Sequence, residues 1–256
     1  MKKSFPGTWD SCPQITKFAS LIQNLMVEGI KVIGFDADDT LWVNEPYYRE
    51  AEEQFVDLVS AYGVRGNIAG KLFNTEIANL ELYGYGIKAF MLSLVECAIE
   101  LTDGALTART VSKILGIGKS MLERPIELLE DVKYVLQQLA PHYRLIVATK
   151  GDLLDQERKM RKSSISDYFH HIEVMSDKKE QHYVQLLKHL DIAPQEFLMI
   201  GNSLKSDIIP PLDLGAWGIW VPFHTTWAHE EVNEEPDSMR YFQVKLLRDV
   251  LKVISH

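Results

Sequence analysis

Cysteine, basic residues and long apolar runs are all scarce in this chain of 256 residues. The two cysteines, Cys12 and Cys97, fit no metal-binding or redox spacing and are predicted to be small apolar residues. No apolar run approaches the length of a membrane span, and the first residues contain no apolar signal segment. These absences argue against a disulfide framework and predict a cytoplasmic protein without membrane contact.

The charge balance is acidic, with 27 Lys and Arg against 36 Asp and Glu and a formal net charge of −9. This argues against nucleic acid as a partner, because affinity for nucleic acid comes mainly from contacts with its phosphates. A small phosphorylated molecule remains compatible, since a bound cation and one lysine can reverse the local sign. With 46% hydrophobic residues, the chain can bury a core as one large domain or as a domain that carries an insertion.

Short apolar runs alternate with helical patterns along most of the chain. Each run is too short for a helix and ends in polar or small residues, as buried parallel strands do. The runs occupy residues 32–35, 145–148, 171–175, 197–200 and 217–221. Helices between them are predicted by apolar residues three or four apart, at Ile126, Leu129, Val132, Leu136 and Leu139 and at Tyr183, Leu186, Leu187 and Leu190. The alternation predicts an α/β fold with a doubly wound, mainly parallel sheet.

One interval breaks this alternation. Residues 44–123 contain helical patterns and several glycines but no convincing strand. We therefore predict a helical domain inserted between the first two strands, with the α/β core formed by residues 1–43 and 124–256. Before the first strand, residues 15–26 have the pattern of an amphipathic helix packed on the core. The acidic run of Glu230, Glu231, Glu234 and Glu235 is predicted to be a solvated loop.

In α/β sheets, ligands bind beyond the carboxyl ends of the strands, so the residues at these ends indicate the chemistry. The first strand is followed by Asp36, Ala37, Asp38, Asp39 and Thr40. A carboxylate in this place can act as a nucleophile or a metal ligand, and a second one can serve as general acid and base. The structural alternative is an acidic turn that caps the next element.

The next two strand ends carry a hydroxyl group and lysines. Thr149, Lys150 and Gly151 follow the second strand, where a hydroxyl and backbone N–H groups can bind a phosphate. Lys178 and Lys179 come soon after the third strand, and a lysine in this place could neutralise phosphoryl charge. The alternative for a lysine on the first turn of a helix is a solvated position.

The fourth strand is followed by Gly201 and Asn202, with Asp207 five residues further on. Amide and carboxylate oxygens are hard ligands of the kind that Mg²⁺ prefers. The alternative is a loop in which Ser206 or Asp207 caps a helix. Each of the four patterns is modest by itself, but their order and their shared place at strand ends make the combination specific.

With these four motifs, the chain resembles the haloacid dehalogenase-like (HAD) hydrolase superfamily over about residues 31–222. The resemblance rests on Asp-Ala-Asp-Asp-Thr after the first strand, Thr149, Lys178, and Gly-Asn-Ser-Leu-Lys-Ser-Asp. It implies that residues 44–123 are the family's helical cap, inserted after the first strand. It also implies a Mg²⁺-dependent phosphatase that acts on a small phosphorylated metabolite through an aspartyl-phosphate intermediate.

The resemblance assigns catalytic roles to the motif residues. Asp36 would attack phosphorus, and Asp38 would protonate the leaving oxygen and later deprotonate the attacking water. Thr149, with the adjoining residues 150–151, would bind the phosphoryl group. Lys178, preferred here over its neighbour, would balance charge between the nucleophile and the phosphoryl oxygens.

The same resemblance implies a set of ligands for Mg²⁺, formed by Asp36, the backbone carbonyl of Asp38, and Asp207. One position departs from the family, because Gly-Asp is more common where this chain has Gly201 and Asn202. Asn retains an oxygen but lacks the charge. It would therefore bind the metal weakly, act through a metal-bound water, or orient Asp207.

Asp38 narrows the chemistry within the family, because dehalogenase-type members lack an Asp there and phosphonatase-type members carry Ala. Phosphatases and phosphomutases on sugar phosphates both remain open. A binding or regulatory protein without turnover is a third alternative, to which Asn202 alone points. The sequence indicates neither the natural substrate nor the oligomeric state.

Three further segments are candidates for contact with a substrate. Trp42 and Tyr47 could line the entrance, with packing in the cap or its hinge as the alternative. Residues 83–88 could form a flexible cap loop, with cap packing again as the alternative. Residues 224–227 are interpreted first as a structural loop and second as a loop on the substrate side.

Overall fold

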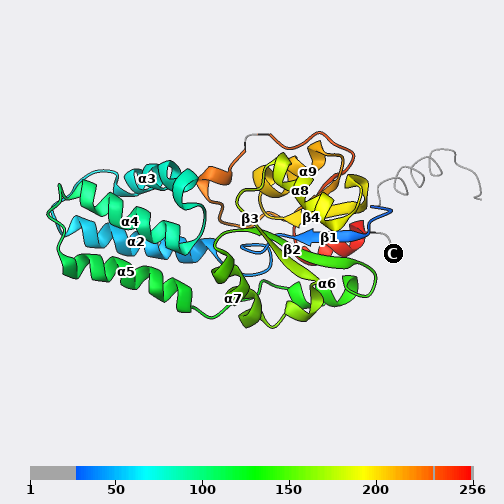
Figure 1. The fold of residues 1–256 in the computed structure, drawn as a ribbon, viewed down its shortest axis with the longest axis horizontal. Helices are drawn as coiled ribbons and strands as arrows, with labels where there is room; N and C mark the ends of the chain where they lie inside the picture. The colour runs from blue at the N-terminus through cyan, green and yellow to red at the C-terminus, as the bar shows by residue number, and fades with distance from the viewer. Residues whose placement is uncertain (1–26, 233, 255–256) are drawn as a thin grey trace, which may run out of the picture.

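Six parallel strands form one sheet in the computed structural model, which describes residues 27–232 and 234–254. The strand order is β3-β2-β1-β4-β5-β6 (Figure 1). The strands are β1 (Val32–Phe35), β2 (Arg144–Lys150), β3 (His171–Met175), β4 (Phe197–Gly201), β5 (Trp217–Trp220) and β6 (Tyr241–Gln243). Five of them lie where the sequence predicts strands, which confirms the doubly wound α/β fold. The predicted helix at 15–26 and Cys12 lie outside the described residues.

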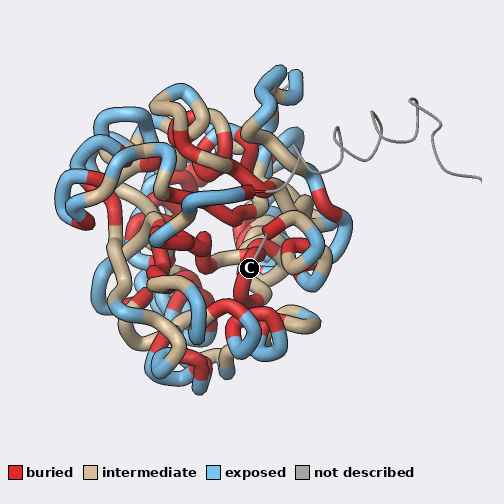
Figure 2. Tube along the Cα trace, turned by 90° about the vertical axis from the view of Figure 1, so that its right-hand side faces the viewer, coloured by how far each residue is buried: buried red, intermediate tan, exposed pale blue. Residues whose placement is uncertain are grey.

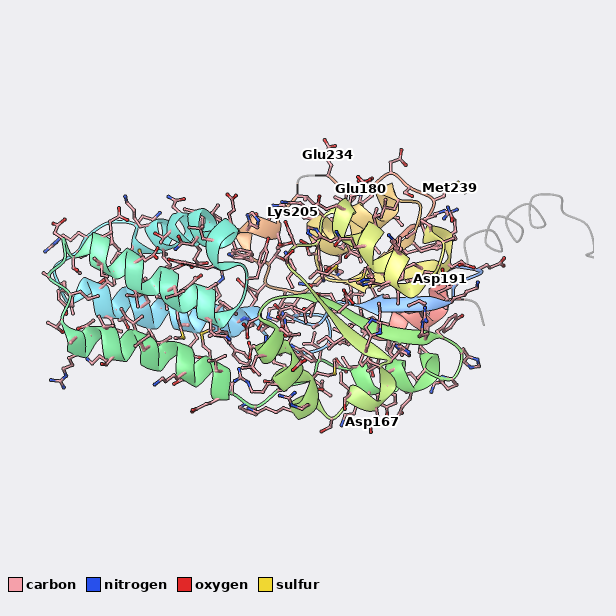
Figure 3. The ribbon with its side chains drawn as sticks, viewed as in Figure 1. Asp167, Glu180, Asp191, Lys205, Glu234 and Met239 are labelled. Atoms are coloured by element: carbon pink, nitrogen blue, oxygen red, sulfur yellow. The ribbon has the colours of Figure 1, made fainter. Side chains whose placement is uncertain are left out.

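Two layers of helices cover the faces of this sheet (Figure 1). One layer contains α6 (Val132–Leu139), α7 (Leu153–Ser163) and α10 (Val250–Val253), and the other contains α8 (Glu180–Leu190) and α9 (Ile209–Asp213). In Figure 3, Asp167 marks the first layer, and Glu180 and Lys205 mark the second. Short helical turns complete the core: η1 (Ser166–Tyr168), η2 (Pro194–Glu196), η3 (Leu204–Ile208), η4 (Ala228–Glu230) and η5 (Leu247–Asp249).

Alternate residues of each strand enter opposite layers, as the pleat of a strand requires. In β1, Ile33 and Phe35 belong to the hydrophobic cluster that contains Leu136 of α6, while Val32 belongs to the cluster that contains Tyr183 of α8. Because both faces of the central strands β1 and β4 are buried, these two strands contain no polar side chain. Each buried aliphatic or aromatic side chain contributes roughly 1.5–3 kcal/mol to folding. Figure 2 shows buried residues in the interior and exposed ones around the perimeter.

Of the five helices between β1 and β2 in the sequence, the first four form one end of the molecule (Figure 1). They are α2 (Glu45–Ser60), α3 (Ile68–Tyr83), α4 (Ile87–Leu101) and α5 (Ala108–Glu123). Their apolar faces share a hydrophobic cluster separate from those of the sheet, with Phe55, Leu94 and Ile114 at its centre. The side chains of Asn67 and Thr107 accept hydrogen bonds from the first turns of α3 and α5, which satisfies donors that a helix start leaves free.

The chain enters and leaves this four-helix segment at one place. The backbone N–H of Val43 donates to the carbonyl of Glu127 at 2.9 Å, and that of Leu129 donates to Leu41 at 3.0 Å. The outgoing and returning connections therefore lie side by side, joined by backbone hydrogen bonds.

Two details of the fold differ from the sequence prediction. The prediction misses β6, because three residues are too few to show a period of two. The helix predicted from Ile126 begins only at Val132, because Asp131 adopts a left-handed φ of 63° and Leu128 instead forms a β-bridge with Trp42. Across the described part of the chain, no helix combines the length and the apolar character needed to cross a bilayer.

Candidate active site

The carboxyl ends of β1, β2 and β4 meet at one edge of the sheet. Phe35, the last residue of β1, pairs with Val147 of β2 and with Ile200 of β4, so the ends of the three strands lie close together. The strand order changes direction at this point, and such a switch point opens a crevice beyond the strand ends. A cavity of about 180 Å³ lies here, lined by the strand-end loops and by residues of α2, α3 and α4.

Asp36, Lys178 and Asp207 form the buried centre of the site. Nζ of Lys178 donates to Oδ1 of Asp36 at 2.5 Å and to Oδ1 of Asp207 at 2.6 Å. Burial and repulsion by Asp207 raise the pKa of Asp36 to about 7, although Lys178 opposes this. Burial alone would lower the pKa of Lys178, but attraction to the two carboxylates raises it above its ordinary value. Two buried carboxylates thus share one cation, which leaves negative charge at the centre.

The neighbouring lysine has a different place. Lys179 is exposed and pairs with Asp177 at 2.8 Å, outside the centre. Of the two lysines near the end of β3, Lys178 is the one that contacts Asp36 and Asp207.

Asp207 reaches the centre because of the backbone around it. It lies in η3, a π-helix, which is a form that often marks functional sites. The N–H of Ser203 donates to Oδ2 of Asp207 at 3.0 Å and fixes that oxygen. A Cβ atom at Gly201 would lie 2.3 Å from the same oxygen, so glycine is needed for the carboxylate to approach β4 this closely.

Oxygen atoms suited to a magnesium ion converge beside Asp36. The amide nitrogen of Asn202 lies among three of them and donates to Oδ2 of Asp36 at 3.2 Å, to the hydroxyl of Thr40 at 3.2 Å and to the carbonyl of Asp38 at 3.3 Å. Within residues 27–232 and 234–254, no three His, Cys, Asp or Glu side chains form a metal-binding group. A site therefore needs the Asp38 carbonyl beside Asp36 and Asp207, and Asn202 could add an oxygen only with its amide turned the other way. These hard oxygen donors, with excess negative charge, fit Mg²⁺.

The carboxylate of Asp38 accepts three hydrogen bonds. Nε1 of Trp42 and Nζ of Lys159 donate to Oδ1 at 2.6 and 2.8 Å, and Nε2 of Gln156 donates to Oδ2 at 2.9 Å. Burial alone would raise the pKa of Asp38, but the charge of Lys159 and the three hydrogen bonds hold it below its ordinary value. Trp42 is 1% exposed, so the prediction that it lines the entrance is wrong, and its packing at the hinge is the correct alternative.

Thr149, Lys150 and Gly151 line the cavity at the end of β2. The buried hydroxyl of Thr149 accepts a hydrogen bond from Nε2 of Gln156 at 3.1 Å. Gly151 has a φ of 124°, which side-chain-bearing residues rarely adopt, so glycine is required at this turn. The ammonium group of Lys150 donates to Oγ of Ser206 at 2.9 Å, across the site.

Glu230 is a site residue that the sequence pattern misses. The prediction of a solvated acidic run is wrong for Glu230, whose side chain is only 12% exposed. It pairs with Lys150 at 2.5 Å and accepts hydrogen bonds from Ser203 and Ser206, both at 2.5 Å. Burial would raise its pKa, but Lys150 and the hydroxyl groups lower it to about 2. Its one signal in the sequence is its place in the loop after β5, close to another strand end.

Two segments far apart in sequence close over the cavity. Its lining includes Gly84, Tyr85 and Gly86 from the α3–α4 turn and Thr225, Thr226 and Trp227 from the loop after β5. The rings of Tyr85 and Trp227 meet edge to face with centres 6.3 Å apart, and Lys88 pairs with Asp152 at 2.9 Å. The second interpretation of residues 224–227, as a loop on the substrate side, is thus the one that their position favours.

Two predicted cavity residues lie elsewhere. Tyr47 donates to Glu127 at 3.1 Å, and Tyr83 donates to Glu96 at 2.5 Å. Neither residue is in the lining of the cavity, so for both of them the position favours the alternative, which is packing in the cap or its hinge.

An all-parallel, doubly wound sheet with paired carboxylates and a lysine at its switch point defines the class of fold and site. Residues 30–212 match the family model of the haloacid dehalogenase-like hydrolases. A solved haloacid dehalogenase-like family hydrolase from Xanthomonas campestris shares 39% sequence identity with this chain and superposes with a TM-score of 0.76. The alignment covers 85% of this chain and 87% of that protein. The chain therefore belongs to the haloacid dehalogenase-like hydrolase family.

Curated relatives match a smaller part of the chain. The human N-acylneuraminate-9-phosphatase is 26% identical over 132 residues, which are 49% of this chain and 53% of that protein. The glyceraldehyde 3-phosphate phosphatase of Pyrococcus abyssi is 31% identical over 120 residues, 44% of this chain and 49% of that protein. The chain spans about half the length of these relatives.

Proposed function

We propose that this protein is a Mg²⁺-dependent phosphatase that hydrolyses a small phosphorylated metabolite through an aspartyl-phosphate intermediate. The observation that carries the proposal is the buried contact of Lys178 with both Asp36 and Asp207, with Asp38 two residues after Asp36. Family membership and the names of two relatives, both phosphatases, support the same activity.

In the first step, a carboxylate oxygen of Asp36 attacks phosphorus while the ester P–O bond breaks. Asp38, which takes up a proton from solvent before this step, donates it to the leaving oxygen. In the second step, Asp38 takes a proton from water, the water oxygen attacks phosphorus, and the bond to Asp36 breaks with release of inorganic phosphate. Thr149 and the backbone N–H groups of the β2 turn orient the phosphoryl group, and Lys178 offsets its charge, which are the main tasks in phosphoryl transfer.

Mg²⁺ would be held by Asp36, the carbonyl of Asp38, Asp207 and, more weakly, Asn202. Bound there, the ion supplies positive charge to the phosphoryl oxygens and fixes their direction. Lys178 alone cannot supply this charge, because its ammonium group is already shared by two carboxylates.

We further propose that residues 44–123 act as a cap domain on a core of residues 1–43 and 124–256. The separate hydrophobic cluster of α2–α5 and the residues that these helices contribute to the cavity support this division. A cap excludes water from the reacting groups and selects the substrate. The cytoplasmic location stays a prediction from the sequence.

The test of the nucleophile is Asp36→Asn, with release of inorganic phosphate from 4-nitrophenyl phosphate and from a panel of phosphorylated metabolites as the measurement. We expect turnover to fall by at least about 1,000-fold, because an amide cannot form the acyl phosphate. The control is Asp167→Asn, an exposed carboxylate in Figure 3. Wild-type turnover in Asp36→Asn would rule out the assignment, and an isomerised product without phosphate release would indicate a phosphomutase.

A further inference from the structure

Three side chains outside the four motifs surround the carboxylate of Asp38. We infer that Trp42, Gln156 and Lys159, called here the Asp38 clamp, position this carboxylate for proton transfer to the leaving group. The inference rests on the proposed function, in which Asp38 is the general acid. It adds three positioning residues that neither the motifs nor the family match assign.

The clamp occupies both oxygens of Asp38 with well-formed hydrogen bonds. Oδ1 accepts from Nε1 of Trp42 at 2.6 Å and from Nζ of Lys159 at 2.8 Å, and Oδ2 accepts from Nε2 of Gln156 at 2.9 Å. Donors on two sides define the rotation about both side-chain bonds of Asp38. One hydrogen bond would leave the second oxygen free to move.

Each member of the clamp is itself held in place. The ring of Trp42 is 1% exposed, and Gln156 is 2% exposed. The side chain of Lys159 is 12% exposed, and its Nζ also donates to Oδ1 of Asn44 at 3.0 Å. Gln156 and Lys159 are three residues apart in α7, so they face Asp38 from the same side of one helix. The three donors are thus held in place themselves, so a rotation of the Asp38 carboxylate would break its hydrogen bonds.

The orientation of Gln156 indicates a role in the site. Its Nε2 has three acceptors within reach: Asp38 at 2.9 Å, the hydroxyl of Thr149 at 3.1 Å and the carbonyl of Lys150 at 2.7 Å. Its Oε1 is buried and has no hydrogen-bond partner among the described residues. An unsatisfied buried oxygen costs about 1–3 kcal/mol. Packing alone gives no reason for this cost, whereas donation to the acid and to the phosphate loop does.

Positioning matters most where proton donation limits the reaction. An alkoxide leaving group needs a proton in the transition state, whereas 4-nitrophenolate leaves readily without one. A general acid contributes roughly 100- to 10,000-fold, and a displacement of about 1 Å can cost about 100-fold. Loss of a clamp donor should therefore slow alkyl phosphates far more than 4-nitrophenyl phosphate.

The experiment compares kcat/KM for 4-nitrophenyl phosphate and for an alkyl phosphate in Lys159→Met and Gln156→Leu. This quantity reports the steps up to departure of the leaving group, so the later hydrolysis of the intermediate does not enter. We expect kcat/KM for the alkyl phosphate to fall roughly 10- to 100-fold and that for 4-nitrophenyl phosphate to change less than about threefold. Lys159→Arg, which keeps charged donors, should recover part of the loss.

The control is Lys162→Met, which removes an exposed lysine from the same helix. An equal fall for both substrates would show a general structural defect and overturn the inference, as would unchanged rates in both clamp variants. If Lys159→Met fails to fold by circular dichroism, Gln156→Leu and Lys159→Arg decide the question. Failure of the wild-type protein with Mg²⁺ to hydrolyse either ester would instead reject the proposed phosphatase function, and the inference with it.

Discussion

Gly201 sets how closely the Asp207 carboxylate approaches the end of β4. An added Cβ atom would lie 2.3 Å from Oδ2 and 2.4 Å from Cγ of Asp207, well inside van der Waals contact. Oδ1 of Asp207 also accepts a hydrogen bond from the ammonium group of Lys178. A methyl group at residue 201 would therefore displace the carboxylate of Asp207 and weaken its hydrogen bond with Lys178.

We expect Gly201→Ala to lower phosphatase turnover by about 100-fold or more while the protein remains folded, since a shift of about 1 Å in a reacting group has this effect. The measurement is kcat with saturating Mg²⁺, together with circular dichroism. Gly116→Ala is the control, because no atom lies within 4 Å of a Cβ built there. Turnover within about threefold of wild type in Gly201→Ala would contradict this account of the glycine.

For individual residues, the motif residues could be predicted from the sequence, whereas the residues that contact and support them could not. Asp36, Lys178 and Asp207 could be identified because each follows a strand and matches a family motif. Lys159 and Glu230 could not, because what distinguishes them is contact with residues 121 and 80 positions away. A lysine in a helix and a glutamate in an acidic run otherwise have the pattern of solvated surface.

Helix α5 contains two glycines whose surroundings differ. Gly116 faces open space, whereas a Cβ at Gly118 would lie 1.9 Å from Sδ of Met91 in α4. We expect Gly116→Ala to raise the free energy of unfolding by about 0.5–1 kcal/mol, because alanine favours the helix. Gly118→Ala should lower it by about 1–3 kcal/mol, because Met91 must move or the helices separate. Urea unfolding of both variants checks this, and equal shifts would contradict the packing argument.

Helix α3 places Glu76 in the cavity wall, where burial and the nearby Glu52 and Glu45 raise its pKa to about 8. The ordinary value is 4.5, so the folded state retains a proton that the unfolded state loses as the pH rises between these values. Folding stability therefore falls from about pH 4.5 to pH 8 through this group.

Glu76→Gln should remove this loss. We compare the Tm of the variant with that of wild type at each pH. This difference in Tm should be roughly 2–4 °C larger at pH 8.5 than at pH 5, which is the shift that about 1 kcal/mol produces in a chain of this size. Differential scanning calorimetry at the two pH values measures it. Glu81→Gln, at an exposed position of the same helix, is the control and should show no pH-dependent difference.

Elements with a long or regular pattern were the predictable ones. The five apolar runs became strands, and Tyr183, Leu186, Leu187 and Leu190 became the buried face of α8. The start of α6 was not predictable, because the left-handed backbone of Asp131 ends the apolar spacing that begins at Ile126. Hydrophobic spacing records which side chains are buried and does not record where the backbone changes direction.

For the whole molecule, a bound ion should stabilise the fold, because it binds only when strand ends distant in sequence are assembled. We expect Mg²⁺ to raise the Tm of the chelator-stripped protein. The free energy of unfolding should increase by about 1.4 kcal/mol for each tenfold excess of the Mg²⁺ concentration over its Kd. Asp207→Asn should abolish most of this shift, and Asp167→Asn should retain it. A wild-type Tm that does not respond to millimolar Mg²⁺ would argue against the metal site without any reference to activity.

The side-by-side connections of the four-helix segment have an evolutionary consequence. The chain departs at Val43 and returns at Glu127, two residues joined by a backbone hydrogen bond. Recombination that replaced the segment between Val43 and Glu127 would need to join two chain ends that lie within hydrogen-bonding distance of each other. Descendants could thus acquire new preferences for the compounds they process while inheriting the carboxylates and lysine of the sheet unchanged.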